Sequence, residues 1–198
     1  MVRVLWLMGP SGSGKSTVGW ALYRQVLADG YTAAYVDFDQ IGFCLPAPAG
    51  DAPHHGLKAS NLRAMWPHYR AAGAECLVAS GYVNDSDALA MYREAIPDAQ
   101  WTVCQLRASS ETLTGRNRAR GRGWGPRLAG DDVVLVSPDE LARRIRGSIE
   151  DAQRLDRHQL GDVVQDTDDL SVSELVELVR SATGMPWPND SSAVRHRT

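Results

Sequence analysis

The residues with the clearest chemical potential lie near the start of the chain, where residues 9–17 read GPSGSGKST and match the pattern GxxxxGK[ST]. In this pattern the glycines let the backbone curl, so that successive N–H groups point at phosphate oxygens at the start of a helix. The spacing predicts that Lys15 reaches the β- and γ-phosphates of a nucleotide and that the Ser16 hydroxyl binds Mg²⁺. We therefore expect a Walker A nucleotide site formed by Gly12, Ser13, Gly14, Lys15, Ser16 and Thr17.

Two acidic residues supply a second set of reactive groups. Residues 35–39 read YVDFD, so Asp37 and Asp39 lie two residues apart at the end of an apolar, β-rich run. Side chains of a strand alternate, which predicts that both carboxylates lie on one side, at the edge where open α/β sheets bind ligands. Two carboxylates there suit phosphoryl transfer, because one can hold a water of the Mg²⁺ shell and the other can accept the proton of a hydroxyl.

Missing motifs narrow the class of nucleotide-binding protein. The chain has no NKxD motif for guanine recognition and no LSGGQ-type signature. The third predicted strand, with ECLVAS at residues 75–80, does not end in the aspartate that often holds Mg²⁺. A kinase is therefore favoured over a GTPase or a transporter ATPase, and the acids at 37 and 39 must supply the missing carboxylate.

Alternating strands and helices must position these groups. Apolar β-rich runs alternate with segments of helical periodicity, which predicts an α/β fold with a doubly wound, five-stranded parallel sheet. We predict a kinase domain over residues 1–184, with an Arg-rich lid at about 115–140, and a C-terminal tail over 185–198. The predicted strands cover 2–8, 31–38, 75–81, 101–106 and 162–165, and the predicted helices cover 15–28, 56–72, 85–96, 109–120, 138–159 and 171–182.

The composition is that of an ordinary globular protein. The chain has 198 residues, of which 43% are hydrophobic and 23% charged, and its formal net charge is −3. This charge does not favour nucleic acid or an anionic membrane as a partner, and no run reaches the roughly 20 apolar residues of a membrane span. The three cysteines are far apart and no signal peptide is evident, so we expect a cytoplasmic protein. Its oligomeric state cannot be predicted.

The phosphate loop and the acidic pair together resemble the P-loop kinases that act on small molecules. This group includes shikimate, gluconate and adenylylsulfate kinases, chloramphenicol phosphotransferase and the zeta-toxin sugar-nucleotide kinases. The resemblance rests on residues 9–17, on VDFD at 36–39 and on an Arg-rich run at 116–127. It implies ATP and Mg²⁺ as cofactors, Asp39 as the base toward the acceptor hydroxyl, and Asp37 beside Mg²⁺ with Ser16. In chloramphenicol phosphotransferase the acceptor-side position resembles Asp37, so the reverse assignment stays open.

The Arg-rich run is the candidate lid. On a helix Arg116 and Arg120 share a face, and guanidinium groups match the geometry of phosphate oxygens. The resemblance implies that Arg116 stacks on the nucleotide, that Arg120 binds phosphate, and that Thr167 borders the adenine. A basic solvated face or an RNA-binding strip is the alternative for the run. Trp124 either covers the site or lies on the surface.

In the related kinases the segment after the acidic pair and the following helix bind the acceptor. Here Lys58 and Arg63 are candidates for holding an anionic acceptor, and Gly81 follows the third strand at the ligand edge of the sheet. The chain departs from the group at Gly42, in the region where an arginine often follows the acidic pair. It also has SGY at residues 80–82 instead of the Gly-Gly-Gly stretch of shikimate kinase, which argues against shikimate as the acceptor.

These observations predict an ATP-dependent kinase that transfers the γ-phosphoryl group to a hydroxyl of a small metabolite, nucleoside, nucleotide or natural product. A polynucleotide 5′-hydroxyl kinase would use the same loop and acid, but it would need a basic channel leading to the site. A nucleotide-binding regulatory module would hydrolyse ATP slowly and would not respond to an acceptor.

Overall fold

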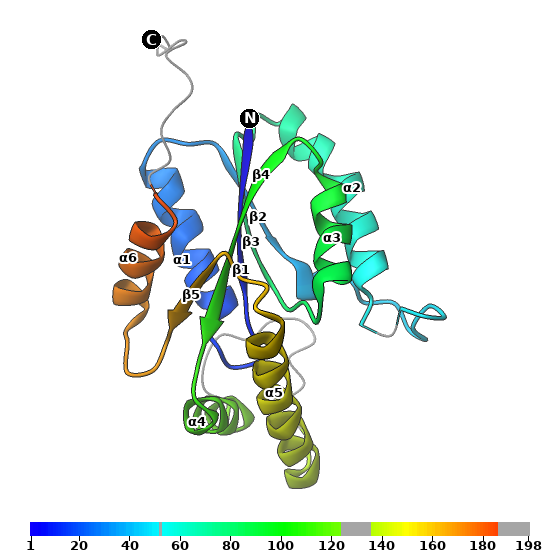
Figure 1. Cartoon of the computed structure of the whole chain (residues 1–198), viewed down its shortest axis with the longest axis vertical. Helices are drawn as coiled ribbons and strands as arrows, with labels where there is room; N and C mark the ends of the chain where they lie inside the picture. Colours follow the sequence, from blue (N-terminus) through cyan, green and yellow to red (C-terminus); the bar gives the residue numbers. More distant parts are fainter. Residues whose placement is uncertain (52, 124–135, 186–198) are drawn as a thin grey trace.

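The computed structural model describes residues 1–51, 53–123 and 136–185. Its centre is a five-stranded parallel sheet with the strand order β2-β3-β1-β4-β5 (Figure 1), which confirms the predicted doubly wound α/β fold. The strands are β1 (Val2–Met8), β2 (Ala33–Asp37), β3 (Cys76–Gly81), β4 (Ala99–Arg107) and β5 (Val163–Asp166). The helices are α1 (Lys15–Ala28), the 3₁₀ turn η1 (Phe38–Gln40), α2 (His55–Ala71), α3 (Ser86–Ala95), α4 (Ser110–Gly121), α5 (Pro138–His158) and α6 (Val172–Ala182).

Helices cover both faces of the sheet, and alternation along β1 decides which of two cores each side chain joins. Trp6 and Met8 pack in the cluster that contains residues of α2 and α3, whereas Leu5 and Leu7 pack with α1 and α6. All four side chains are completely buried. Figure 1 shows the two helical layers on opposite sides of the sheet. The phosphate loop therefore begins directly after the central strand β1, whose last residues are completely buried.

Local capping signals begin the helices close to the predicted positions. The Ser109 side chain accepts a hydrogen bond from the Thr112 N–H at the start of α4. Ser171 and Glu174 form a reciprocal capping box at the start of α6. Predicted and observed boundaries agree to within a few residues, which is the usual uncertainty of helix ends.

The second strand ends earlier than predicted, and this changes how the acidic pair is positioned. Extended structure stops at Asp37, and the next three residues form η1. The Asp37 carboxylate accepts the Asp39 N–H at 3.0 Å and so caps this turn. Strand alternation was therefore the wrong reason for expecting both carboxylates at one site, because a side-chain-capped 3₁₀ turn places Asp39 there.

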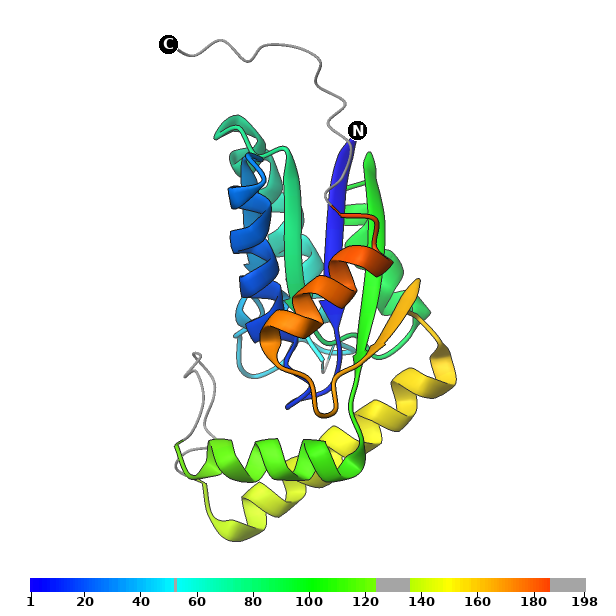
Figure 2. The same cartoon turned by 90° about the vertical axis from the view of Figure 1, so that its left-hand side faces the viewer.

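The helices α4 and α5 lie beyond the end of the sheet at which the phosphate loop opens (Figure 2). The predicted lid spans the end of α4, the start of α5 and the segment between them, and only its central part does not belong to the described residues. Residues 124–135, which include Trp124 and Arg127, and residues 186–198 of the predicted tail lie outside the described parts of the chain.

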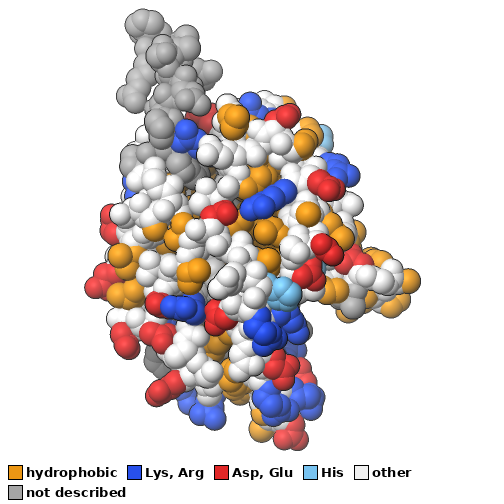
Figure 3. Space-filling view, viewed as in Figure 1, with side chains coloured by type: hydrophobic (Ala, Val, Ile, Leu, Met, Phe, Trp, Pro, Cys, Tyr) orange, Lys and Arg blue, Asp and Glu red, His pale blue; other side chains and the backbone are white. Residues whose placement is uncertain are grey.

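A proline-containing loop connects η1 to α2. It projects from the body of the molecule and carries mainly hydrophobic side chains (Figure 3). Phe43 and Leu45 are 63% and 85% exposed. In the parts of the chain that the structure describes, no helix has the length and apolar character needed to cross a membrane.

Candidate active site

The phosphate loop joins β1 to α1 with the backbone geometry that its motif predicts. Gly12 and Gly14 have φ values of +86° and +93°, in the left-handed region that disfavours any side chain. A Cβ atom on Gly12 would also lie 2.7 Å from Nδ2 of Asn117. The loop leads into the first turn of α1, whose leading N–H groups have no partner within the helix and favour an anion.

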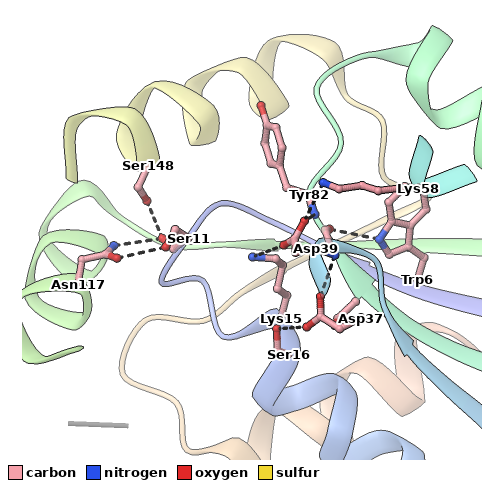
Figure 4. Close-up of polar contacts among 12 residues, drawn as sticks. Trp6, Ser11, Lys15, Ser16, Asp37, Asp39, Lys58, Tyr82, Asn117 and Ser148 are labelled. Carbon is pink, nitrogen blue, oxygen red and sulfur yellow. Dashed lines mark hydrogen bonds and ion pairs between the residues drawn. The ribbon is translucent and has the colours of Figure 1, made fainter. Parts of the chain in front are cut away.

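The first acid is paired with the hydroxyl that follows Lys15. Ser16 Oγ donates to Asp37 Oδ2 at 2.7 Å, so α1 and the end of β2 present two oxygen ligands side by side (Figure 4). Tyr35 supports this pair, because its hydroxyl bonds to Ser80 Oγ at 2.9 Å and donates to the Ser16 carbonyl at 3.3 Å. The arrangement brings together the two residues that the sequence assigns to Mg²⁺.

The second acid lies between two lysines (Figure 4). Lys15 Nζ is 3.3 Å from Asp39 Oδ2, Lys58 Nζ is 3.7 Å from Asp39 Oδ1, and the Tyr82 N–H donates to Oδ1 at 3.2 Å. Burial alone would raise the pKa of the Asp39 carboxyl, but the two ammonium groups and the amide outweigh burial and hold that pKa below its ordinary value. Asp39 is therefore an ionised acceptor at neutral pH, and both lysine side chains are only 12% exposed.

Arg116 forms hydrogen bonds that connect the phosphate loop to the residue after β5. Its guanidinium donates to the Thr167 carbonyl at 2.7 Å, to the Thr167 hydroxyl at 3.0 Å and to the Gly12 carbonyl at 3.3 Å. These contacts join α4, the loop after β5 and the phosphate loop at the place where the sequence predicts the nucleotide base. The proposed stacking of Arg116 on the nucleotide stays a prediction.

Sequence reasoning missed two polar side chains that hold the tip of the loop. Asn117 is buried, and its Nδ2 donates to the carbonyls of Ser11 at 3.2 Å and Leu113 at 2.9 Å. Ser148 of α5 donates to the same Ser11 carbonyl at 2.6 Å. An asparagine inside an arginine-rich helix was the available signal, whereas a single serine in a polar helix gives none.

A second cluster, whose α5 residues the sequence did not indicate, joins α5 to Tyr82, directly after β3. Arg154 donates to the Tyr82 hydroxyl and to the Asp151 carboxylate, each at 3.0 Å. Burial raises the pKa of Asp151 above its ordinary value, although Tyr82, Arg154 and the charge of Lys15 all act to lower it. Since the Tyr82 N–H also bonds to Asp39, this cluster is tied directly to the acidic pair. The i, i+3 spacing of Asp151 and Arg154 indicated a helix-surface ion pair, and nothing local indicated their place beside the site.

The remaining predicted residues differ in how closely they approach the acids. Gly81 lies against η1, where a Cβ atom would be 2.8 Å from Cβ of Phe38, and its carbonyl accepts the Trp6 indole N–H at 3.2 Å. Arg120 reaches the Ser11 hydroxyl at 3.4 Å, on the nucleotide side. Arg63 is exposed on α2 and makes no hydrogen bond or ion pair with the described residues of the site. Its role as an acceptor ligand stays a prediction.

The donor set around the loop can hold a metal ion only in part. Among the described residues, no group of three or more His, Cys, Asp or Glu side chains is arranged to bind one. The Ser16 and Asp37 oxygens fit a small hard cation that takes its other ligands from phosphates and water, which is the usual environment of Mg²⁺.

Comparisons with known proteins point to one group of enzymes. The sequence model of the Adenylylsulphate kinase family matches residues 1–57, which include the phosphate loop and both acids. An adenylyl-sulfate kinase of Vibrio parahaemolyticus serotype O3:K6 (strain RIMD 2210633) is 28% identical over 143 residues, which cover 68% of each chain.

Solved structures show the same fold across nearly the whole chain. A shikimate kinase of Bacteroides thetaiotaomicron has a TM-score of 0.61 and 14% identity, and the match covers 92% of this chain and 99% of that one. A gluconokinase of Sinorhizobium meliloti 1021 has a TM-score of 0.57 and 20% identity, with 92% and 94% covered. At these identities the likeness concerns the fold. Together, the two sequence matches confirm the predicted resemblance to the P-loop kinases of small molecules and the predicted class, an ATP-dependent phosphotransferase with a hydroxyl acceptor. The solved structures confirm the predicted fold.

Proposed function

We propose that this protein transfers the γ-phosphoryl group of Mg·ATP to a hydroxyl of a small anionic molecule, with Asp39 as the group that receives the hydroxyl proton. The observation that carries this proposal is the position of Asp39, 3.3 Å from the phosphate-loop lysine and bonded on its other side to the acceptor edge of β3. The ionised carboxylate accepts the O–H of the acceptor and orients its oxygen toward the γ-phosphorus.

The transfer then follows from the charges around Asp39. The acceptor oxygen forms a bond to the γ-phosphorus, the bond to the bridging oxygen of ADP breaks, and the hydroxyl proton passes to Asp39. Lys15 leaves Asp39 for the phosphates and stabilises the charge that develops on them. Arg120, which bonds to Ser11 of the loop, would add a second cation on that side.

The Ser16 and Asp37 pair is the proposed metal site. Ser16 Oγ would bind Mg²⁺ directly, and Asp37 would hold the ion or one of its waters. The ion would neutralise charge on the β- and γ-phosphates. The hydrogen bond that Asp37 accepts from Ser16 of α1 favours this assignment of the two acids over the reverse one, because Asp39 instead accepts the Tyr82 N–H on the acceptor side.

The acceptor is proposed to be an anion because the half-exposed Arg154 reaches Tyr82 from α5 on the acceptor side. Lys58, the other cation on that side, is paired with Asp39. Adenylyl sulfate, gluconate and shikimate, the acceptors named by the relatives, are all anionic hydroxyl compounds. Adenylyl sulfate is the first candidate, because the family match covers the phosphate loop and both acids.

The proposal is tested by ADP release from Mg·ATP against a panel of hydroxyl compounds. The panel contains adenylyl sulfate, gluconate, shikimate, nucleosides, neutral sugars, chloramphenicol and a 5′-hydroxyl oligonucleotide, with Lys15→Ala as the blank. We expect Lys15-dependent release with one class of anionic small molecule. Release driven by a neutral compound would overturn the anionic acceptor, and release driven only by the oligonucleotide would establish the polynucleotide kinase.

A further inference from the structure

A close contact links Gly42 to Lys58. Gly42 is buried, and a Cβ atom built on it would lie 2.6 Å from both Cγ and Cε of Lys58 and 3.2 Å from Cδ. The side chain of Lys58 therefore runs through the space that a side chain at position 42 would fill. The backbone of Gly42 does not require glycine, since its φ lies outside the left-handed range. Glycine is needed at this position because it leaves room for the Lys58 side chain, and not because of its backbone conformation.

The route through this space ends at Asp39. Lys58 begins on the first turn of α2, where its N–H donates to the His54 carbonyl at 2.8 Å, and its Nζ reaches Asp39 Oδ1 at 3.7 Å. The Asp39 carboxylate thus has one lysine on each oxygen, Lys15 on Oδ2 and Lys58 on Oδ1. The two lysines are also the only ones in the chain, which otherwise uses arginine.

The two lysines cannot both keep their ion pairs with Asp39 once a nucleotide binds. Lys15 belongs to the phosphate loop and is attracted to the β- and γ-phosphates. A carboxylate left beside the phosphates without a cation would be repelled by them and would lose its fixed position. Lys58 comes from α2, on the other side of the acid, and has no such competing partner.

We propose that Lys58 is the positioning residue that holds Asp39 when Lys15 turns to the nucleotide, and that Gly42 is glycine because any side chain there displaces Lys58. The proposal rests on the proposed function, in which Asp39 receives the acceptor proton. It assigns to Lys58 a role in orienting the base and distinguishes that role from direct contact with the anion of the acceptor.

Chemical labelling of the two lysines tests the contact without any acceptor. The full chain is treated with a trace of acetic anhydride, and acetylation of Lys15 and Lys58 is followed by peptide mass spectrometry, with and without Mg²⁺ and the non-hydrolysable analogue AMPPNP. We expect the analogue to protect Lys15 and to leave Lys58 as protected as before. Gly42→Ala and Asp39→Asn should each raise the rate at Lys58 several-fold. Gly115→Ala is the matched control, because a Cβ atom there meets nothing within 4 Å.

The labelling results separate the inference from the proposed function. Failure of AMPPNP to protect Lys15 would contradict the nucleotide site, whatever happens at Lys58. An unchanged rate at Lys58 in Gly42→Ala, or exposure of Lys58 when the analogue binds, would overturn the inference alone. Circular dichroism of each variant shows whether the fold is kept, and Asp39→Asn tests the same contact without altering Gly42.

Kinetics with the acceptor identified by the panel give the second readout. Lys58→Met and Gly42→Ala should lower kcat by about tenfold, corresponding to ~1.4 kcal/mol, while the KM values for ATP and the acceptor change little. Lys58→Arg should restore part of kcat, because it keeps a cation on this side of Asp39. A raised KM for the acceptor with an unchanged kcat would make Lys58 a substrate ligand and overturn the positioning role.

Discussion

The two sides of Asp39 are built in different ways. On the nucleotide side, one continuous segment supplies the glycines, Lys15 and Ser16. The backbone N–H groups of this segment are expected to bind the phosphate oxygens. On the acceptor side, Lys58, Tyr82 and Arg154 come from α2, the end of β3 and α5, and only tertiary packing brings them together. A chemical group common to all nucleotides can be bound by a fixed local motif, whereas the acceptor side is assembled from separate elements that can vary independently.

The largest expected effect comes from the residue that both sides share. Asp39→Asn removes the proton acceptor and both ion pairs, and we expect kcat to fall by about 10²- to 10⁴-fold while the fold is kept. The exposed acid Asp87, changed to asparagine, is the control for loss of a carboxylate. Full activity of Asp39→Asn in steady-state assays would remove Asp39 from its role as base.

The next largest effect lies on the nucleotide side. Lys15→Ala removes the cation that stabilises the transferring phosphoryl group, so we expect kcat to drop by about 10²- to 10³-fold. The exposed Arg24 on the same helix, changed to alanine, should leave kcat unchanged. If Lys15→Ala weakened only ATP binding, as measured by calorimetry, and left kcat intact, the lysine would not act in the transition state.

A smaller and more selective effect is expected on the acceptor side. Arg154→Met removes a half-exposed cation that bonds to Tyr82 and Asp151, and we expect the KM for the acceptor to rise about tenfold, or ~1.4 kcal/mol. The KM for ATP should not change, which distinguishes the two sides of the site. An equal rise in both KM values would show that α5 serves the nucleotide as well.

The degree to which the sequence predicted the site follows the same division. The phosphate loop and the presence of Ser16, Asp37 and Asp39 at one site were predictable because the loop motif and the acidic pair are local patterns. The contact between Lys15 and Asp39 joins two separate segments and was not predicted. The link from Arg154 through Tyr82 to Asp39 was not, because it depends on how α5 packs across the end of the sheet.

The fold itself was predictable in most respects. Alternating apolar runs and helical periodicity gave the strands and helices, and capping residues such as Ser109 and Ser171 located helix starts. The turn after Asp37 was missed because an apolar residue between two acids reads as continuing strand. The Asp37 side chain reverses that preference by capping the Asp39 N–H.

The smallest expected effect concerns stability beneath the acceptor side. His55 is 4% exposed and bonds to the Tyr92 hydroxyl at 3.1 Å, and burial, followed by the charge of Lys58, lowers its pKa. Below about pH 6.5 the unfolded chain binds this proton more readily than the folded one, so the free energy of unfolding should decline as the pH falls. Urea denaturation across this range should show a shallower decline in His55→Gln, whereas the exposed His68→Gln should behave like the unchanged protein.

The most direct test of the central claim is the fate of the γ-phosphoryl group. ATP labelled with ¹⁸O at its γ-phosphate is incubated with Mg²⁺, the protein and the anionic hydroxyl compounds, and the products are identified by mass spectrometry. The account predicts that the label appears as a phosphate ester of one acceptor, and that Lys15→Ala and Asp39→Asn both abolish this product. Label recovered only as inorganic phosphate, at a rate that no acceptor changes, would contradict a kinase and would establish a nucleotide-binding module with slow hydrolysis.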